Sequence, residues 1–265
     1  MNAKLAHFSE AMKGFQDKYI LIGGNACALV FEHHGGEFRQ TQDLDIVLVI
    51  EEWTKEFAEA LWQYFSDGKY VSRKFHQGQT HGNVYRFVIP DESDTLDEFP
   101  KQIELFSRAP DDVELFEKAH LTPIETEEGV SNFSAILVDD DYYKLLKEAV
   151  LPIDTVNTVT HQCLTVLKAK AWIGNKQLFA EGKIKPEREG DVHKHAFDIC
   201  RLLTLFEDKD VSSLPQKIYD DVMEVSGLFK SKDEQSTLDK NIGDQELPLG
   251  YDDASALLPD FFKLA

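Results

Sequence analysis

Two aspartates at the start of an apolar segment are the residues best suited to chemistry. Asp43 and Asp45 stand two positions apart, and the stretch that follows, up to Ile50, is almost wholly aliphatic. Because side chains alternate along a strand, both acids are predicted to lie on one face. Neighbouring carboxylates repel each other, and a magnesium ion, which prefers oxygen ligands and bridges carboxylates to phosphates, relieves that repulsion. Acids that merely begin a solvated strand are the alternative.

A glycine pair precedes these acids. Gly23 and Gly24 follow the apolar run 19–22 and come just before a predicted helix at 25–31. A glycine turn at a helix N-terminus lets backbone N–H groups approach a phosphate closely. The pair therefore indicates a phosphate site, with a plain tight turn as the alternative.

Three further polar side chains extend this predicted site. Arg39 and Thr41 lie just before the acids, and Arg39 could bind phosphate or pair with a carboxylate as a structural ion pair. Glu104 stands between Ile103 and Leu105 in a second apolar segment. If that segment neighbours 43–50, Glu104 supplies the third carboxylate of a two-metal site. The outward side of an alternating strand is the alternative for Glu104.

The elements that must position these residues alternate between helix and strand in the first half of the chain. Strands are predicted at 19–22, 43–50, 84–89, 102–106 and 134–138, and helices at 1–18, 25–31, 53–66, 111–119 and 142–150. Helical periodicity prevails afterwards, at 157–174, 191–206 and 214–229, and the apolar residues 257–264 are expected to pack back on this bundle. We therefore predict an α/β (α+β) fold with a mixed sheet in residues 1–150 and a mainly helical domain in residues 151–265.

The glycine and aspartate motifs resemble those of the polymerase-β-type nucleotidyltransferase superfamily, and within it the AbiEii-like nucleotidyltransferase toxins. The resemblance rests on the run GGNA, on R-x-T-x-D-L-D before an apolar strand, and on a later strand carboxylate. It implies the nucleotidyltransferase fold and two Mg²⁺ ions. It also implies catalytic and metal-binding roles for Asp43, Asp45 and Glu104, and nucleotide-binding roles for Gly23, Gly24, Arg39 and Thr41.

The resemblance extends into the helical half. AbiEii-like proteins carry a lysine on one helix of the second domain and a Lys-Asp-x-x-Asp-like stretch on a later helix. Lys168 and Lys170 match the first feature, and Lys194 and Asp198 match the second, although His195 stands where an acid is common. The resemblance thus implies that these four residues bind nucleotide, and a solvated helix face is the alternative for the lysines.

The activity that the resemblance implies is transfer of a nucleoside monophosphate from a nucleoside triphosphate such as ATP to an acceptor hydroxyl. The acceptor would be tRNA if the chain is the toxin of a toxin–antitoxin pair, with an antitoxin protein as partner. Two other functions stay open. One is a nucleotidyltransferase acting on a small molecule such as an aminoglycoside, and the other is a non-catalytic nucleotide-binding protein of the same fold.

Charge, hydropathy and cysteine spacing limit the partners and the cell compartment that we expect. The formal net charge of −20 opposes broad contact with nucleic acid or an anionic membrane. No apolar run approaches the roughly 20 residues that span a bilayer, so we expect a cytoplasmic protein with no membrane partner. Cys27, Cys163 and Cys200 are far apart, which predicts buried thiols in a reducing compartment and neither a disulfide framework nor a zinc site.

Overall fold

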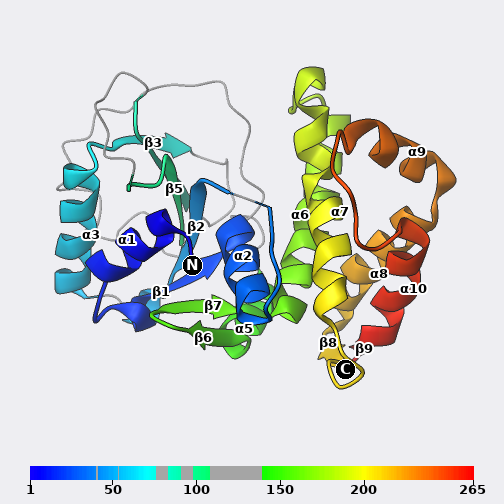
Figure 1. Ribbon diagram of the computed structural model, residues 1–265, viewed down its shortest axis with the longest axis horizontal. Coiled ribbons are helices and arrows are strands. Elements are labelled where there is room, and N and C mark those ends of the chain that lie inside the picture. Colours follow the sequence, from blue (N-terminus) through cyan, green and yellow to red (C-terminus); the bar gives the residue numbers. More distant parts are fainter. Residues whose placement is uncertain (40, 53, 76–82, 91–97, 108–138) are drawn as a thin grey trace. The chain divides into compact units, whose positions relative to one another are not determined.

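The chain divides into two compact units, Met1–Thr160 and His161–Ala265. The sequence suggested a division after residue 150, but the hairpin of β6 (Val150–Ile153) and β7 (Val156–Val159) belongs to the first unit. It is anchored there because the Thr158 hydroxyl donates to the carbonyl of Leu21 at 3.0 Å. The computed structural model, drawn in Figure 1, describes residues 1–39, 41–52, 54–75, 83–90, 98–107 and 139–265.

The first unit is built on a five-stranded mixed sheet with the strand order β1-β2-β5-β4-β3. Strands β2 and β5 pair in parallel, whereas the other neighbouring strands pair antiparallel. This mixture agrees with the α+β class expected from the sequence. The strands are β1 (Tyr19–Ile22), β2 (Asp43–Leu48), β3 (Val71–Phe75), β4 (Asn83–Val88) and β5 (Gln102–Ser107).

Helices of the first unit pack on this sheet through aromatic and aliphatic side chains. They are α1 (Ala3–Ala11), α2 (Gly23–His33), α3 (Lys55–Asp67) and α5 (Asp140–Glu148), with the short 3₁₀ turns η1 (Gln16–Lys18) and η2 (Ile50–Glu52). In α3, Phe57, Leu61 and Phe65 recur every four residues and are buried. The Phe65 ring stacks on Phe87 of β4 with the centroids 3.9 Å apart, so α3 covers the sheet face that carries Phe87.

Several predicted elements differ from those observed in this unit. The helix expected at 1–18 ends at Ala11, and Gly14 then adopts a positive φ of 90°, which an α-helix does not tolerate. Strand β3 and the β6–β7 hairpin were not predicted. The helix expected at 111–119 and the strand expected at 134–138 lie outside the described residues.

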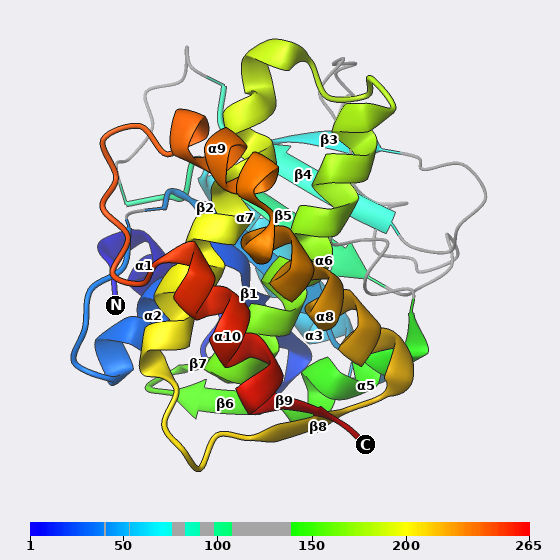
Figure 2. The same ribbon diagram turned by 90° about the vertical axis from the view of Figure 1, so that its right-hand side faces the viewer.

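The second unit is mainly helical, as expected, and Figure 2 turns its helices toward the viewer. Helices α6, α7 and α8 fall on the three predicted segments, but residues 157–159 of the first segment belong to strand β7. The helices are α6 (His161–Ala180), α7 (Glu189–Leu202), α8 (Gln216–Lys230), α9 (Lys232–Asn241) and α10 (Tyr251–Phe261). Shorter elements are η3 (Pro186–Arg188), η4 (Leu203–Leu205), and the paired strands β8 (Ser212–Leu214) and β9 (Phe262–Leu264).

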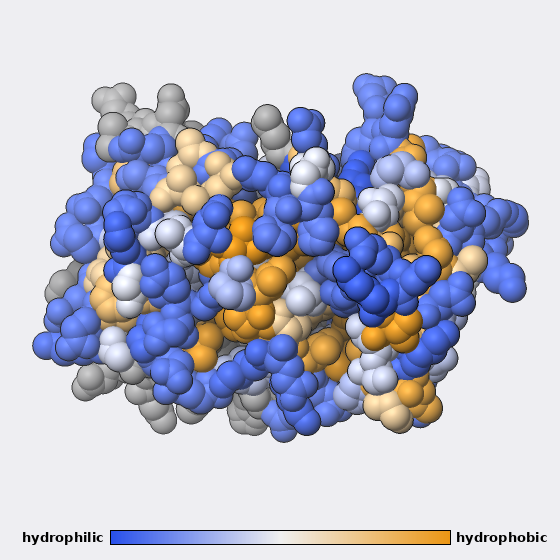
Figure 3. Space-filling model, turned by 60° about the horizontal axis from the view of Figure 1, so that its bottom comes forward, coloured by the Kyte–Doolittle hydropathy of each residue, from blue (hydrophilic) through white to orange (hydrophobic). Residues whose placement is uncertain are grey.

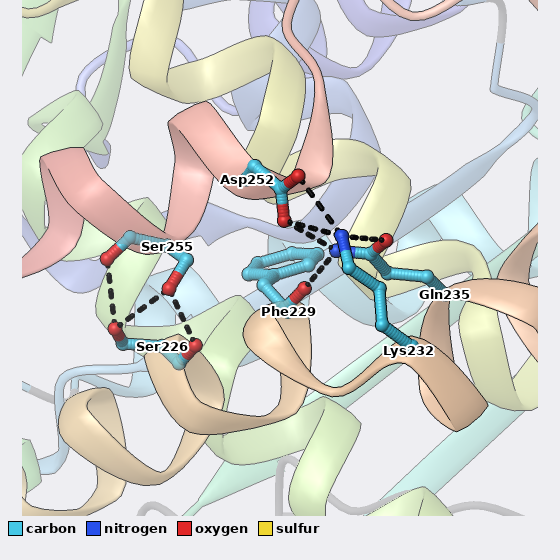
Figure 4. Close-up of polar contacts among 6 residues, drawn as sticks. All are labelled: Ser226, Phe229, Lys232, Gln235, Asp252 and Ser255. Carbon is cyan, nitrogen blue, oxygen red and sulfur yellow. Dashed lines mark hydrogen bonds and ion pairs between the residues drawn. The ribbon is translucent and has the colours of Figure 1, made fainter.

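The C-terminal apolar segment packs on the bundle, as the sequence predicted. Leu258 and Phe262 are fully buried, and α10 lies along α8. Side-chain bonds join the same elements, as Figure 4 shows: the Ser226 hydroxyl of α8 donates to the carbonyl of Ser255 at 2.8 Å. Lys232 of α9 lies 3.0 Å from the Asp252 carboxylate of α10. Helices α8, α9 and α10 therefore form one packed group.

Hydrophilic residues cover much of the face shown in Figure 3, with hydrophobic residues gathered between them. In the part of the chain that the structure describes, no helix combines the length and the apolar character needed to cross a bilayer. All three cysteines are buried and none forms a disulfide. Burial raises the pKa of the Cys163 and Cys200 thiols to about 12, as expected for core thiols.

Candidate functional site

The strand register brings the three predicted acids onto one face of the sheet. Asp45 of β2 pairs directly with Glu104 of β5, and Asp43 pairs with Gln102. Partners on neighbouring strands project to the same side, so Asp43, Asp45 and Glu104 share a face. The opposite face is apolar, because Leu44 and Ile103 alternate with the acids and are buried. Parallel pairing of β2 with β5 is therefore what brings Glu104 to the aspartates.

The glycine turn lies directly against this acidic row. Gly23 follows β1 with a φ of 74°, and a Cβ atom built on it would stand 1.8 Å from Oδ2 of Asp45. A Cβ atom on Gly24 would stand 3.0 Å from the Thr41 hydroxyl oxygen. The absence of side chains at this turn thus allows the start of α2 to touch both Asp45 and Thr41. Four of the predicted site residues are in mutual proximity.

Asn25, the next residue of α2, fixes the start of β2. Its side chain is buried, and its Nδ2 donates to the backbone carbonyl of Asp43 at 2.6 Å. Its Oδ1 accepts from Nδ2 of Asn2, also at 2.6 Å, and Asn2 in turn caps α1 by accepting from the Leu5 N–H. Sequence analysis did not assign Asn25 a role. The available signal was an amide side chain among the apolar positions of a helix.

Glu104 is buried and engaged by two polar neighbours. Its Oε1 accepts from Nε of Arg86 at 2.9 Å and from Nε2 of Gln102 at 3.0 Å, and it lies 2.7 Å from Nη2 of Arg86. Glu104 lies on the sheet face opposite the apolar one, but it is not exposed to solvent, since only 6% of the residue is exposed. Arg86 was missed from the sequence. The signal was a lone basic residue within the apolar strand 84–89.

The residues present fit a magnesium ion at the aspartate pair. Asp43 is exposed and Asp45 half-buried, and both offer the oxygen ligands that magnesium prefers. Over the described ranges, no three His, Cys, Asp or Glu side chains are grouped closely enough to hold a metal ion. The three-carboxylate metal set, with Glu104 as its third member, therefore stays a prediction.

Arg39 lies at the approach to the aspartates. It is half-buried, and its guanidinium carbon stands 5.5 Å from the centroid of the Phe38 ring, within the range of a cation–π contact. The structure therefore gives Arg39 an aromatic contact, and its binding to phosphate stays a prediction.

Three of the four predicted residues of the second unit, Lys168, Lys170 and Asp198, have partners within that unit. Lys168 and Asp198 are both buried, and Nζ of Lys168 donates to Oδ2 of Asp198 at 2.8 Å. Lys170 donates to both carboxylate oxygens of Asp221, at 3.0 and 2.8 Å. Lys194 is exposed on α7. The solvated-face alternative is thus wrong for Lys168, and nucleotide binding by all four predicted residues stays a prediction.

Comparisons with known proteins identify no relative: no protein-family model and no curated protein matches this sequence. The geometry on which a function can be proposed is therefore that of the first unit.

Proposed function

We propose that this protein is a magnesium-dependent nucleotidyltransferase, which moves a nucleoside monophosphate from a nucleoside triphosphate to an acceptor hydroxyl. The observation that carries the proposal is the register of β2 and β5, which pairs Asp45 with Glu104 directly beside the Gly23 turn. A phosphate-binding turn and adjacent carboxylates are the two components that phosphoryl transfer with a divalent ion requires.

The N-terminus of α2 is the expected binding place of the triphosphate. The first N–H groups of a helix have no partner within the helix and carry partial positive charge. Ile22, at the N-cap position, makes no side-chain capping bond. Phosphate oxygens over Gly23 and Gly24 would meet these N–H groups, with the Thr41 hydroxyl alongside. The glycines permit this approach because no Cβ atom stands in the way.

Asp43 and Asp45 are the residues that would hold Mg²⁺. When bound, the ion neutralises phosphate charge and lowers the pKa of the attacking hydroxyl. Asn25 keeps the Asp43 backbone in place, so the carboxylates are positioned before substrate arrives. The acceptor oxygen then bonds to the α-phosphorus, the bond to the β-phosphate oxygen breaks, and pyrophosphate leaves. The hydroxyl proton passes to a carboxylate of the site or to water.

The acceptor is proposed from charge and resemblance together. A tRNA end needs only a small contact area, which is compatible with a net charge of −20. Modification of tRNA by the toxin of a toxin–antitoxin pair, with an antitoxin as partner, is therefore the acceptor hypothesis. The same negative charge favours a cationic small molecule as the second candidate acceptor. A non-catalytic nucleotide-binding protein is the third candidate. It is favoured by the contact of Arg86 with Glu104, because that contact occupies an oxygen that a second metal ion would use.

Label transfer from nucleoside triphosphates tests the proposal. Each triphosphate, labelled at the α-phosphate, is incubated with magnesium, the protein and a cell extract that contains RNA. We expect a labelled product with the wild type. In Asp43→Asn we expect the transfer rate to fall roughly 10²–10³-fold, because that variant removes a carboxylate that would hold the magnesium ion. Glu59→Gln is the matched control, since Glu59 is an exposed acid of the same unit.

Circular dichroism of both variants shows whether they fold. Equal transfer by the wild type and Asp43→Asn would remove the assignment of Asp43. Magnesium-dependent nucleotide binding without any labelled product would establish the non-catalytic alternative. Removal of magnesium with a chelator is expected to abolish transfer by the wild type and by Glu59→Gln alike.

A further inference from the structure

We propose that Arg86 takes the place of a second metal ion, so that the site holds one divalent ion, at Asp43 and Asp45. Glu104 is then the positioning residue of Arg86 and not a metal ligand. The inference rests on the proposed function and departs from the two-ion site that the sequence implies. It follows from the contacts, burial, charge and strand register of Arg86 and Glu104.

The contacts of Glu104 converge on one oxygen. Oε1 receives the Nε–H of Arg86, the Nε2–H of Gln102 and the close approach of Nη2 of Arg86 at 2.7 Å. A carboxylate oxygen has about two lone-pair sites, so these donors occupy it. A metal ion at Oε1 would have to displace a charge-assisted guanidinium contact, which is among the strongest side-chain hydrogen bonds, and one at Oε2 would share the carboxylate with a guanidinium cation that repels it.

Burial makes this pairing persistent. The side chains of Arg86 and Glu104 are 12% and 8% exposed. A carboxylate removed from water needs a partner at all times, and a guanidinium keeps its charge at every physiological pH. Arg86 is part of the chain, so it neutralises Glu104 whether or not a metal ion is present.

Charge decides how many ions the site requires. Before a triphosphate binds, three ionised carboxylates and one guanidinium carry a formal charge of −2, which a single divalent cation balances. Without Arg86 the third charge would remain, and a second cation would be favoured there. The charge of Arg86 thus lowers the number of divalent ions that the nucleotide-free site needs.

The register places Arg86 where a phosphate-binding cation is useful. Arg86 pairs with Glu104 across β4 and β5, and Glu104 pairs with Asp45 across β5 and β2, so the three residues form one row on one face. The Gly23 turn, at the positive end of α2, touches the Asp45 end of this row. The row is therefore positive at both ends and acidic between them, which suits a triphosphate with one bound ion.

A manganese titration of the full-length protein tests the inference without measuring activity. Free Mn²⁺ is followed by its electron paramagnetic resonance signal, and ions bound by an Asp43→Asn/Asp45→Asn double variant are subtracted as background. We expect one site-specific ion in the wild type and in Glu104→Gln. We expect two ions in Arg86→Ala, because Glu104 then joins the aspartates, and one ion again in Arg86→Ala/Glu104→Gln.

Matched variants keep the test decisive. Arg86→Ala leaves a buried carboxylate without its cation and could fail to fold, which circular dichroism detects. Glu104→Gln and the Arg86→Ala/Glu104→Gln variant avoid that unpaired charge, and each is expected to keep one ion. Affinity for a fluorescent ATP analogue should fall by roughly tenfold in Arg86→Ala/Glu104→Gln but stay near the wild-type value in Glu104→Gln.

The outcomes separate this inference from the proposed function. Two site-specific ions in the wild type, loss of the ion in Glu104→Gln, or unchanged ATP-analogue affinity without Arg86 would overturn the role of Arg86 and leave the nucleotidyltransferase proposal intact. No manganese above background in the wild type, together with no binding of the ATP analogue, would overturn both.

Discussion

At the scale of single residues, the close approach of Gly23 to the Asp45 carboxylate fixes where the start of α2 meets the acidic row. Gly23 adopts a positive φ, and its missing side chain leaves the space that the Asp45 carboxylate fills. An L-residue in this conformation costs about 1–2 kcal/mol from the backbone alone. A Cβ atom would in addition overlap the Asp45 side chain, so the helix start and the acid would have to separate.

We expect Gly23→Ala to destabilise the first unit by more than this backbone cost and to displace Asp45. Gly35→Ala is the matched control, because Gly35 has a similar φ of 76° but no atom beyond its chain neighbours lies within 4 Å of the position that its Cβ would take. Urea unfolding measures both variants. If the two substitutions cost the same, the contact between Gly23 and Asp45 has no energetic importance.

A buried histidine gives a second prediction at this scale. Burial lowers the pKa of His193 below its ordinary value of 6.5. The charge of Lys176 also lowers this pKa, whereas the charges of Glu234 and Glu189 raise it. Because the unfolded chain binds the proton more readily, the contribution of His193 to stability is present above pH 6.5 and is lost as the pH falls.

Between pH about 7.5 and about 5.5, the free energy of unfolding measured with urea should therefore fall further in the wild type than in His193→Gln. His33→Gln, at an exposed position, is the control and should behave as the wild type does. Identical pH dependence of the wild type and His193→Gln would contradict the prediction.

Short sequence separation explains which site residues could be predicted. Asp43 and Asp45 share a face through strand alternation, and Gly23 follows from the strand-to-helix turn. Arg86 could not be assigned, because its partner Glu104 lies 18 residues away and their pairing depends on the β4–β5 register. Asn25 of α2 was missed for the same reason, since its acceptor, the Asp43 carbonyl of β2, lies 18 residues away.

At the scale of elements, a cap positions the helix that covers the apolar face of the sheet. The Thr54 hydroxyl accepts the N–H of Phe57 at 3.3 Å at the start of α3. We expect Thr54→Ala to cost about 1 kcal/mol of unfolding free energy, since an N-cap oxygen satisfies an otherwise unpaired N–H group. Thr54→Ser retains the oxygen and should restore most of that stability in thermal and urea unfolding. A Thr54→Ser variant as unstable as Thr54→Ala would assign the loss to packing of the Thr54 methyl.

Elements with a clear apolar period were predicted, and weakly patterned ones were not. Helix α3 and strand β1 follow from the spacing of their apolar residues. The β3 segment carries Arg73 and Lys74 within five residues, so its sequence lacks the apolar alternation of a strand. The β6–β7 hairpin contains Pro152, a residue type that is disfavoured within strands, although a two-stranded hairpin leaves an edge position for proline.

At the scale of the whole molecule, charge is the dominant property. The chain has 48 acidic and 28 basic side chains, so at neutral pH the excess carboxylates repel one another and destabilise the folded state. Added salt screens this repulsion, so raising NaCl from about 0.02 M to about 0.5 M in the presence of a chelator should raise the Tm. A rise of roughly 2–4 °C corresponds to about 1 kcal/mol for a chain of this size.

The same salt change near the pI of about 4.8 is the control, because the net charge vanishes there and screening has little to act on. A fall in Tm with salt at neutral pH would show that local ion pairs outweigh the net repulsion.

The sequence by itself determined the local features of this protein. Apolar spacing specified most helices and strands, alternation placed Asp43 and Asp45 together, and glycine chemistry marked the turn before α2. These features depend on residues within a few positions of one another, where chain geometry leaves few alternatives.

The tertiary structure alone decided which distant segments meet. Parallel pairing of β2 with β5 brought Glu104 beside Asp45, and antiparallel pairing of β4 gave Glu104 its guanidinium partner. Packing of the second unit then joined Lys168 to Asp198, for which the sequence predicted nucleotide binding, with a solvated helix face as the alternative for Lys168. Strand register and side-chain burial result from the packing of the whole unit, and no local pattern encodes them.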